Sequence, residues 1–456
     1  MRSPLVLGTA ALATAASAAP NYIFYFDQWH TANLPDKSQT AGVTHVITAF
    51  ANSSLFAAEP AGKYEPFKPL DEIRVLFDDG TKVCMAIGGW ADTAGFSAGA
   101  KTDKTRKRYA RNVADTLARL GYDCVDQDID WEYPAGNGED YKRIPNSKKV
   151  DEIKSYPKLL KEIKNAIGDK ELSIAVPGLE RDMIAYTHEQ VPKINAVVDY
   201  VNIMSYDLMN RRDSVTTHHS SYEGTAKAVD AYISRGFQPS KLNIGFAFYA
   251  KWFTTKAGVQ CTEPTGCPTE LLEAADGSDT GKSGTITFEK ANFVEAPKNL
   301  TVSPDGSCGA GTSFKCGEVT CCSQFGFCGN STAHCSTGCQ SAYGRCEGID
   351  ISGSFLTAME NGKTDTAAGG QWYWDATTSL YWTWDTADLI TQKINGLVPT
   401  KGLGGIFAWS LAQDSQDWSR LTAMREGFNT LSGQSSGRSK ASHFKKHQGH
   451  YGHPSY

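Results

Sequence analysis

The chain has 456 residues, of which 40% are hydrophobic and 21% are charged, a composition that supports a folded protein with a large core. Its formal net charge is -5 and it has no long basic block, so we expect no nucleic-acid partner. Residues 1–20 place an apolar run after a single Arg and end in small residues. This pattern is typical of a signal peptide spanning 1–18, so we expect a secreted, extracellular protein that crosses no membrane. Asn52, Asn299 and Asn330 each begin a glycosylation sequon.

Short apolar runs alternate with amphipathic segments along most of the chain. The expected strands cover 22–26, 44–50, 82–89, 124–131, 172–178, 200–207, 242–249 and 403–410. Segments with helical spacing, such as 104–121 and 156–168, lie between them and end in Gly. Eight strands that alternate with helices predict an α/β fold, a (β/α)₈ TIM barrel. In such a barrel the catalytic residues lie at the carboxyl ends of the strands.

A long gap separates the last two predicted strands, and eight of the twelve cysteines lie in it, between Cys308 and Cys346. We therefore expect a barrel formed by 19–304 and 348–432, interrupted by a disulfide-rich module at 305–347. So small a unit needs cross-links to stay folded, and its cysteines lack zinc-finger spacing, so we expect no metal. Residues 433–456 are polar, basic and rich in His, which predicts a disordered tail.

Four further cysteines lie outside that module. Cys261 and Cys267 are close enough in sequence to close a small loop. Cys84 and Cys124 lie on neighbouring predicted strands with side chains toward the bottom of the barrel. A disulfide between them and two buried free thiols both remain open.

The stretch DCVDQDIDWEYP, residues 123–134, is dense in acids. Because side chains alternate along a strand, one face carries the four acids Asp126, Asp128, Asp130 and Glu132. Burying isolated carboxylates is costly, so such neighbours share protons and their pKa values separate. This can leave a general acid protonated near neutral pH, as glycoside hydrolysis requires. A calcium site or a solvated acidic edge is the alternative, but the acids follow a strand pattern and not a Gly-rich loop.

The segment DIDWEYP resembles the signature of glycoside hydrolase family 18 chitinases, Asp-x-x-Asp-x-Asp-x-Glu, with its last three acids at Asp128, Asp130 and Glu132. AIGGW (86–90) is similar to the family's Ser-x-Gly-Gly block, MSYD (204–207) to its Met-x-Tyr-Asp, and Trp409 to a Trp on its last strand. Two positions depart from the pattern. Val125 stands where the family has its first Asp, and Ala86 stands where it usually has Ser. We expect these departures to tune the acid and not to abolish the reaction.

The resemblance implies retaining, substrate-assisted hydrolysis. Glu132 would protonate the glycosidic oxygen, and the substrate's own N-acetyl group would form an oxazolinium intermediate. Asp130 would orient the acetamido group, Asp128 would store negative charge behind it, and Tyr206 would hydrogen-bond the acetamido oxygen. The substrate-binding residues implied by the resemblance are Trp409, Met204, Asp207, Trp131 and Trp90. No cofactor is expected, the partners would be chitin and chito-oligosaccharides, and we expect a monomer.

The cysteine spacing of the inserted segment resembles that of hevein-type chitin-binding modules. The pairing it implies is Cys308–Cys322, Cys316–Cys328, Cys321–Cys335 and Cys339–Cys346. The sugar-binding positions it implies are Ser323, Phe325, Phe327 and His334. A purely structural knob is the alternative for the module. Trp29, Trp90 and Trp252 stay open between sugar contacts and barrel core.

Taken together, these features predict a secreted chitinase that cleaves β-1,4 bonds between N-acetylglucosamine units and anchors its substrate with the inserted module. A catalytically weak chitin-binding lectin is one alternative, against which Glu132 argues. An endo-β-N-acetylglucosaminidase acting on glycoprotein glycans is another, against which the chitin-binding module argues.

Overall fold

The computed structural model describes residues 19–90, 92–128, 146–293, 298–309, 312–323, 325–335 and 339–433. The expected signal peptide lies outside the described residues, as does nearly all of the expected tail. Asp130, Trp131 and Glu132 also lie outside them, although the strand that leads to these residues is described. Of the helices in the described ranges, none has the length and apolar character needed to span a membrane.

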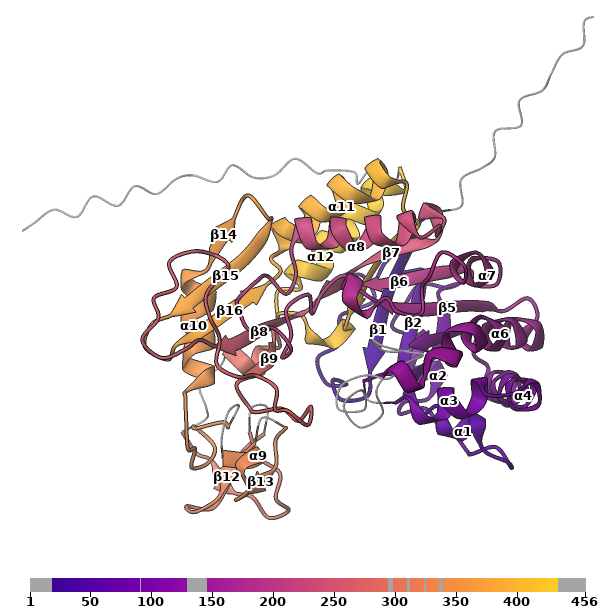
Figure 1. Ribbon diagram of the computed structural model, residues 1–456. Helices are drawn as coiled ribbons and strands as arrows, with labels where there is room; N and C mark the ends of the chain where they lie inside the picture. Colours follow the sequence, from indigo (N-terminus) through magenta and orange to yellow (C-terminus); the bar gives the residue numbers. More distant parts are fainter. Residues whose placement is uncertain are drawn as a thin grey trace, which may run out of the picture.

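Eight parallel strands in the described part of the chain close a barrel, as the sequence predicts (Figure 1). Their order around the barrel is β1-β17-β7-β6-β5-β4-β3-β2. Their bounds are β1 Asn21–Asp27, β2 His45–Ala51, β3 Lys82–Gly88, β4 Cys124–Asp128, β5 Glu171–Pro177, β6 Tyr200–Met204, β7 Leu242–Ala247 and β17 Gly405–Trp409. All eight predicted strand positions are therefore confirmed.

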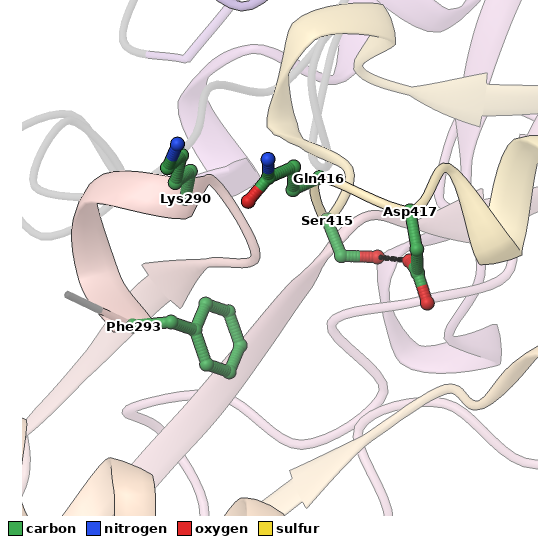
Figure 2. A pocket seen from close by; sticks show the side chains of 5 residues that line it. All are labelled: Lys290, Phe293, Ser415, Gln416 and Asp417. Atoms are coloured by element: carbon green, nitrogen blue, oxygen red, sulfur yellow. Dashed lines mark hydrogen bonds between the residues drawn. The ribbon is translucent and has the colours of Figure 1, made fainter.

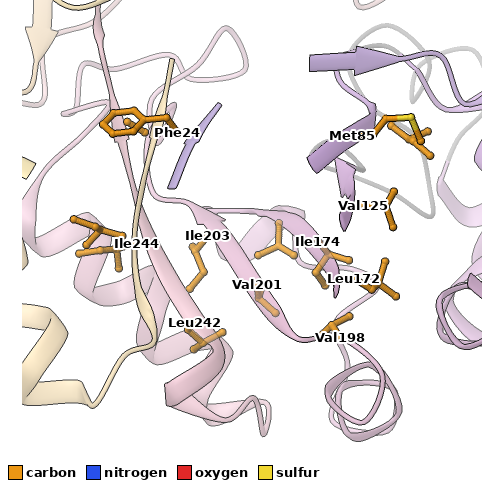
Figure 3. Packing of buried hydrophobic residues seen from close by; sticks show 14 of the residues in the cluster. Phe24, Met85, Val125, Leu172, Ile174, Val198, Val201, Ile203, Leu242 and Ile244 are labelled. Atoms are coloured by element: carbon orange, nitrogen blue, oxygen red, sulfur yellow. The ribbon is translucent and has the colours of Figure 1, made fainter. Parts of the chain in front are cut away.

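The strands are apolar on their outward face, where the helices cover them. Val125 on β4 lies in this outer cluster with Met85 on β3 and Ile174 on β5 (Figure 3). The inward side chains form a separate cluster that contains Tyr25, Cys84, Ala86, Cys124 and Phe407 among others. The alternation along β4 therefore points Val125 outward and Asp126 inward, as the period of a strand requires.

Helices connect the strands and pack on the outside of the barrel (Figure 1). The helix α4, Asp103–Leu120, begins at a Thr102–Thr105 capping box and ends at Gly121, whose φ of 80° suits a residue without Cβ. Helix α6, Val150–Ile167, packs beside it. The remaining helices of the barrel are α1 Ser54–Ala57, α2 Leu70–Arg74, α3 Ala94–Ala100, α7 Val191–Asn195, α8 Tyr222–Ser234, α11 Ala387–Lys401 and α12 Ser419–Leu431.

A second sheet, which the sequence analysis did not predict, fills most of the gap between β7 and β17. Among the described residues it has five antiparallel strands in the order β14-β15-β16-β8-β9. The bounds are β8 Tyr249–Thr254, β9 Ser283–Thr287, β14 Lys363–Asp365, β15 Gly370–Asp375 and β16 Leu380–Trp384, with helix α10, Ile351–Asn361, alongside. Trp252 and Trp382 are paired across β8 and β16 and are both buried in its core. Trp252 is therefore a core residue of this sheet.

The cysteine-rich segment hangs from this second sheet and not directly from the barrel (Figure 1). Its described elements are β10 Thr301–Val302, β11 Phe314–Lys315, β12 Cys321–Cys322, β13 Cys328–Gly329 and α9 Thr332–Cys335. Its disulfides are Cys308–Cys322, Cys316–Cys328, Cys321–Cys335 and Cys339–Cys346, the pairing that the resemblance implies. Their sulfurs, with Tyr343, make up most of the module's small core, so the cross-links replace apolar burial.

The other four cysteines also form disulfides. Cys261 is bonded to Cys267 as expected. Cys84 and Cys124, in register on β3 and β4, form a bond that settles the question left open by the sequence. This bond lies inside the barrel, one inward step below Asp126.

Candidate active site

Strand β4 carries two carboxyls on the inner face of the barrel. Asp126 is completely buried and Asp128 is 5% exposed at the strand's carboxyl end. The predicted acidic inward face is thus present at these two positions. The acids that follow, Asp130 and Glu132, lie outside the described residues.

Asp126 is held by hydroxyl groups from both sides of the barrel. Tyr25 on β1 donates from Oη to its Oδ2 at 2.8 Å, and Ser173 on β5 donates from Oγ to its Oδ1. Burial raises the pKa of Asp126 to about 6, although these two donors act in the opposite direction. Burial, together with the neighbouring charge of Asp126, raises the pKa of Asp128 well above its usual range. The two carboxyls therefore share protons across neutral pH.

The glycines at the end of β3 allow β4 to approach closely. Gly88 has φ 118°, and a Cβ at this position would lie 2.0 Å from the backbone oxygen of Asp128. A Cβ on Gly89 would meet the ring of Phe50 at 2.7 Å. Any side chain at Gly88 or Gly89 would push the Asp128 end of the acidic strand away from its neighbours.

Tyr206 and Asp207 follow β6, at the same end of the barrel as Asp128. Tyr206 is 7% exposed and packs edge-on to Tyr249 and Phe407. Asp207 has φ 55°, and its Oδ1 accepts from Tyr249 Oη at 2.9 Å and lies 3.0 Å from Lys251 Nζ. Burial opposes ionisation of Asp207, but the Lys251 ammonium holds the pKa of this carboxyl well below its usual range. Asp207 is therefore a fixed negative charge.

Met204 is the last residue of β6 and lies half-buried against the inner cluster. Its neighbours in that cluster include Tyr206 and Tyr25. Met204 thus borders the same end of the barrel interior as the acids of β4.

Aromatic rings form a continuous surface around the barrel mouth. Trp409, at the end of β17, stacks on Phe50 with ring centroids 5.4 Å apart and planes at 14°. Tyr25 lies 5.7 Å from Trp409 on its other side, and Trp29 lies 6.3 Å from Phe50. Trp409 is half-buried and Trp29 is 63% exposed, so both leave ring area open. Such faces suit the apolar faces of sugar rings.

Trp90 follows the glycines of β3 and is 48% exposed. The guanidinium of Arg211 lies over its ring at 5.6 Å. Trp29 and Trp90 therefore stay at the surface, in contrast to Trp252.

Asp27 is a site residue that the sequence analysis missed. It ends β1, is fully buried, and accepts from the backbone amides of Trp29 and His30 at 2.9 and 3.0 Å. Ser410, next to Trp409, also donates to it. Asp27 thus ties the loop carrying Trp29 to the strand end carrying Trp409. Only the closure of β1 onto β17 brings these segments together, and no local signal in the sequence indicates that contact.

Two hollows are present on the described surface. One, of 320 Å³, lies where the second sheet meets the end of the barrel and is lined by Lys290, Phe293, Ser415, Gln416 and Asp417 (Figure 2). The other, of 500 Å³, lies at the amino ends of β1, β2, β3 and β5 and is lined by residues such as His45 and Glu171. Neither is lined by Asp128. The larger hollow lies at the opposite end of the barrel from the acids, so we assign it no catalytic role.

Comparison with known proteins places this architecture. A profile described as glycosyl hydrolases family 18 matches residues 21–414, which is most of the chain. The chain belongs to glycoside hydrolase family 18. Among curated members, it is 28% identical over 293 residues to sporulation-specific chitinase 2 of Saccharomyces cerevisiae, covering 54% of each chain. It is 28% identical over 238 residues to chitinase A1 of Niallia circulans, covering 46% of this chain and 31% of that protein. The chain thus matches about half or less of these two relatives' length.

Solved structures of family 18 members share the fold. A chitinase from Rhizomucor miehei superposes with a TM-score of 0.62 at 17% identity, covering 89% of this chain and 99% of the other. An N-acetylglucosaminidase from Paenibacillus barengoltzii gives a TM-score of 0.59 at 16% identity, with coverage of 90% and 99%. At such low identity, these neighbours confirm the architecture and not the substrate.

The cysteine-rich module presents two rings to solvent. Phe325 is 74% exposed and Phe327 is 60% exposed. Ser323 is buried at the base of the same turn, where its Oγ accepts from the backbone amide of Phe327 at 3.2 Å. His334 packs against Gly329, and its Nδ1 lies 2.7 Å from Ser331 Oγ. The turn around Ser323 therefore fixes the backbone from which both Phe rings project.

Proposed function

We propose that this protein is a chitinase that hydrolyses β-1,4-linked N-acetylglucosamine polymers, with Glu132 as general acid and base. The observation that carries the proposal is the pair of inward carboxyls, Asp126 and Asp128. They lie at the carboxyl end of β4 in a family 18 chain, and the strand leads directly into Asp130 and Glu132. The curated relatives named above are themselves chitinases by name.

The proposed reaction uses one protein acid and one group of the substrate. Glu132 protonates the glycosidic oxygen while the substrate's acetamido oxygen attacks the anomeric carbon, so the bond to the leaving sugar breaks and an oxazolinium forms. Asp130 orients the acetamido group, and negative charge behind it stabilises the positive ring. Water, deprotonated by Glu132, then opens the intermediate with retention of configuration.

The mouth of the barrel would hold the sugar. Tyr206 would donate from its hydroxyl to the acetamido oxygen, and the open face of Trp409 would support the sugar ring. Asp207, kept ionised by Lys251, would accept from sugar hydroxyls. The resemblance also places Met204, Trp90 and Trp131 among the residues that touch the substrate.

The inserted module would anchor the polymer outside the cleft. Phe325 and Phe327 would stack on sugar faces, with Ser323 and His334 beside them. We also propose that residues 1–18 direct secretion. The pairing of all twelve cysteines in six disulfides fits an oxidising compartment.

The product configuration tests the proposal. The wild-type protein is incubated with chitohexaose and with the fully deacetylated hexamer, and the first products are followed by proton NMR. We expect the β-anomer to appear first from chitohexaose and no cleavage of the deacetylated hexamer, because the acetamido group is the nucleophile. Initial α-anomer, or equal cleavage of both oligomers, would refute the mechanism. Binding without any cleavage would favour the chitin-binding lectin.

A further inference from the structure

Asp126 is a buried carboxyl that the proposed reaction leaves without a role. The family signature places acids at the positions of Asp128, Asp130 and Glu132 and at the position occupied here by Val125. Val125 points outward into the cluster shown in Figure 3, so it has not taken over an inward position. Asp126 lies instead on the inward face, one strand repeat below Asp128.

The surroundings of Asp126 favour its charged form. Both of its oxygens accept from hydroxyls, one from Tyr25 and one from Ser173. The Tyr25 oxygen in turn accepts from Asn202 Nδ2 at 3.0 Å, and Asn202 Oδ1 accepts from Asn243 Nδ2 at 2.9 Å. This chain of donors is directed toward Asp126, so each hydrogen bond stabilises a negative charge there.

The register of the strands shows how the room for this carboxyl arises. Ala86 on β3 is in register with Asp126 on one side, and Ser173 on β5 is in register on the other. The family's usual Ser at position 86 is thus absent, and a hydroxyl comes from β5. The two departures at Val125 and Ala86 therefore belong to one rearrangement centred on Asp126.

Asp128 has a different environment. No hydrogen bond to its carboxyl is present among the described residues, and neither carboxyl forms an ion pair within them. The titratable groups that face the pair from other segments are Tyr25 on β1, Tyr200 on β6 and Tyr186 before α7. Burial raises the pKa of all three tyrosines above the usual range, so they are neutral at neutral pH. The charge that acts on Asp128 from the described residues is that of Asp126.

We propose that Asp126 carries the buried negative charge of this site and keeps Asp128 protonated, which makes Asp126 a positioning residue that sets the alkaline limit of hydrolysis. The negative charge behind the reacting acids then lies one step deeper in the barrel than the family signature alone indicates. Loss of the Asp128 proton ends activity at high pH. The kinetic part of this inference rests on the proposed function, whereas the placement of charge and proton does not.

Infrared difference spectra against pH test the placement directly. The carbonyl stretch of protonated Asp128 is identified as the band that is missing from Asp128→Asn. In the wild type we expect this band to persist above neutral pH. In Asp126→Asn we expect its midpoint to fall by about one to two pH units, the effect of removing a unit charge one strand repeat away in a protein interior. The alkaline limb of kcat/KM on a soluble chito-oligosaccharide should move to lower pH by a similar amount.

Two further variants keep the test decisive. Val125→Ala alters the outward face of the same strand, so it should weaken stability and leave the infrared midpoint and the pH profile unchanged. Tyr25→Phe removes one donor to Asp126, so charge should move from Asp126 to Asp128 and the midpoint should again fall, even if Asp126→Asn does not fold. An Asp128 midpoint that is the same in wild type, Asp126→Asn and Tyr25→Phe would overturn the inference. The infrared result needs no turnover, so a chain that cleaves no oligosaccharide would refute the proposed function alone.

Discussion

The two exposed rings of the cysteine-rich module allow a quantitative prediction. Phe325 and Phe327 project into solvent, and neither belongs to the core of the module. Their replacement by Ala should therefore change the free energy of unfolding by less than about 0.5 kcal/mol. If each ring stacks on a sugar with about 1 kcal/mol, the Kd for chitin should rise about fivefold in each single variant and about thirtyfold in the double variant.

Depletion isotherms on colloidal chitin measure this effect, in a Glu132→Gln background so that the substrate is not consumed. Val319→Ala is the matched control, because Val319 is 72% exposed on the same module but lies outside the proposed sugar-binding set. Hydrolysis of a short soluble oligomer by the Phe variants with Glu132 intact should stay at the wild-type rate. Unchanged chitin affinity in the double variant, or equal weakening by Val319→Ala, would refute the assignment of the binding face.

Three predictions concern stability. The disulfide between Cys84 and Cys124 closes a loop with a sequence separation of 40, so the double Cys→Ser variant should lose about 4 kcal/mol in urea unfolding, and a loss below about 1 kcal/mol would contradict this. Lys393 and Asp385 are both fully buried and paired at 2.7 Å, so Lys393→Met should cost about 3–5 kcal/mol by leaving a buried carboxylate unpaired, and a neutral effect would show that this pair is dispensable. Burial opposes ionisation of Glu171, but hydrogen bonds from His45 and Lys82 lower its pKa to about 2; its contribution is therefore present above its ordinary pKa and is lost as the pH falls through about 2. Glu171→Gln should thus be less stable than wild type at pH 7 and equal to it near pH 2, and a constant difference would contradict the assignment.

The barrel was predictable because its strands are continuous apolar runs, and such runs mark strands buried on both faces. The inward direction of Asp126 and Asp128 followed from the same period of two. The second sheet was not predicted, because its strands are short and separated by the cysteine-rich module. Its central pairing joins Trp252 to Trp382 across a long stretch of chain, and nothing local in the sequence indicates that partner.

The residues of the site divide in a similar way. Asp128, Tyr206 and Trp409 follow strands, so the barrel geometry brings them to one end without further information. The support of Asp126 by Tyr25 and Ser173 depends on three strands that are distant in sequence, and the role of Asp27 depends on the closure of β1 onto β17. Such contacts become visible only when the barrel is closed.

Hydrolysis by wild type and Glu132→Gln tests the central claim most directly. A fluorogenic N-acetylglucosamine oligomer is the substrate, and chitin binding and thermal unfolding of both proteins are measured in parallel. We predict that the variant folds and binds chitin like the wild type while its kcat falls by several orders of magnitude, because the proton donor is gone. A variant that hydrolyses the oligomer at the wild-type rate would contradict the account, and so would a folded, chitin-binding wild type without activity.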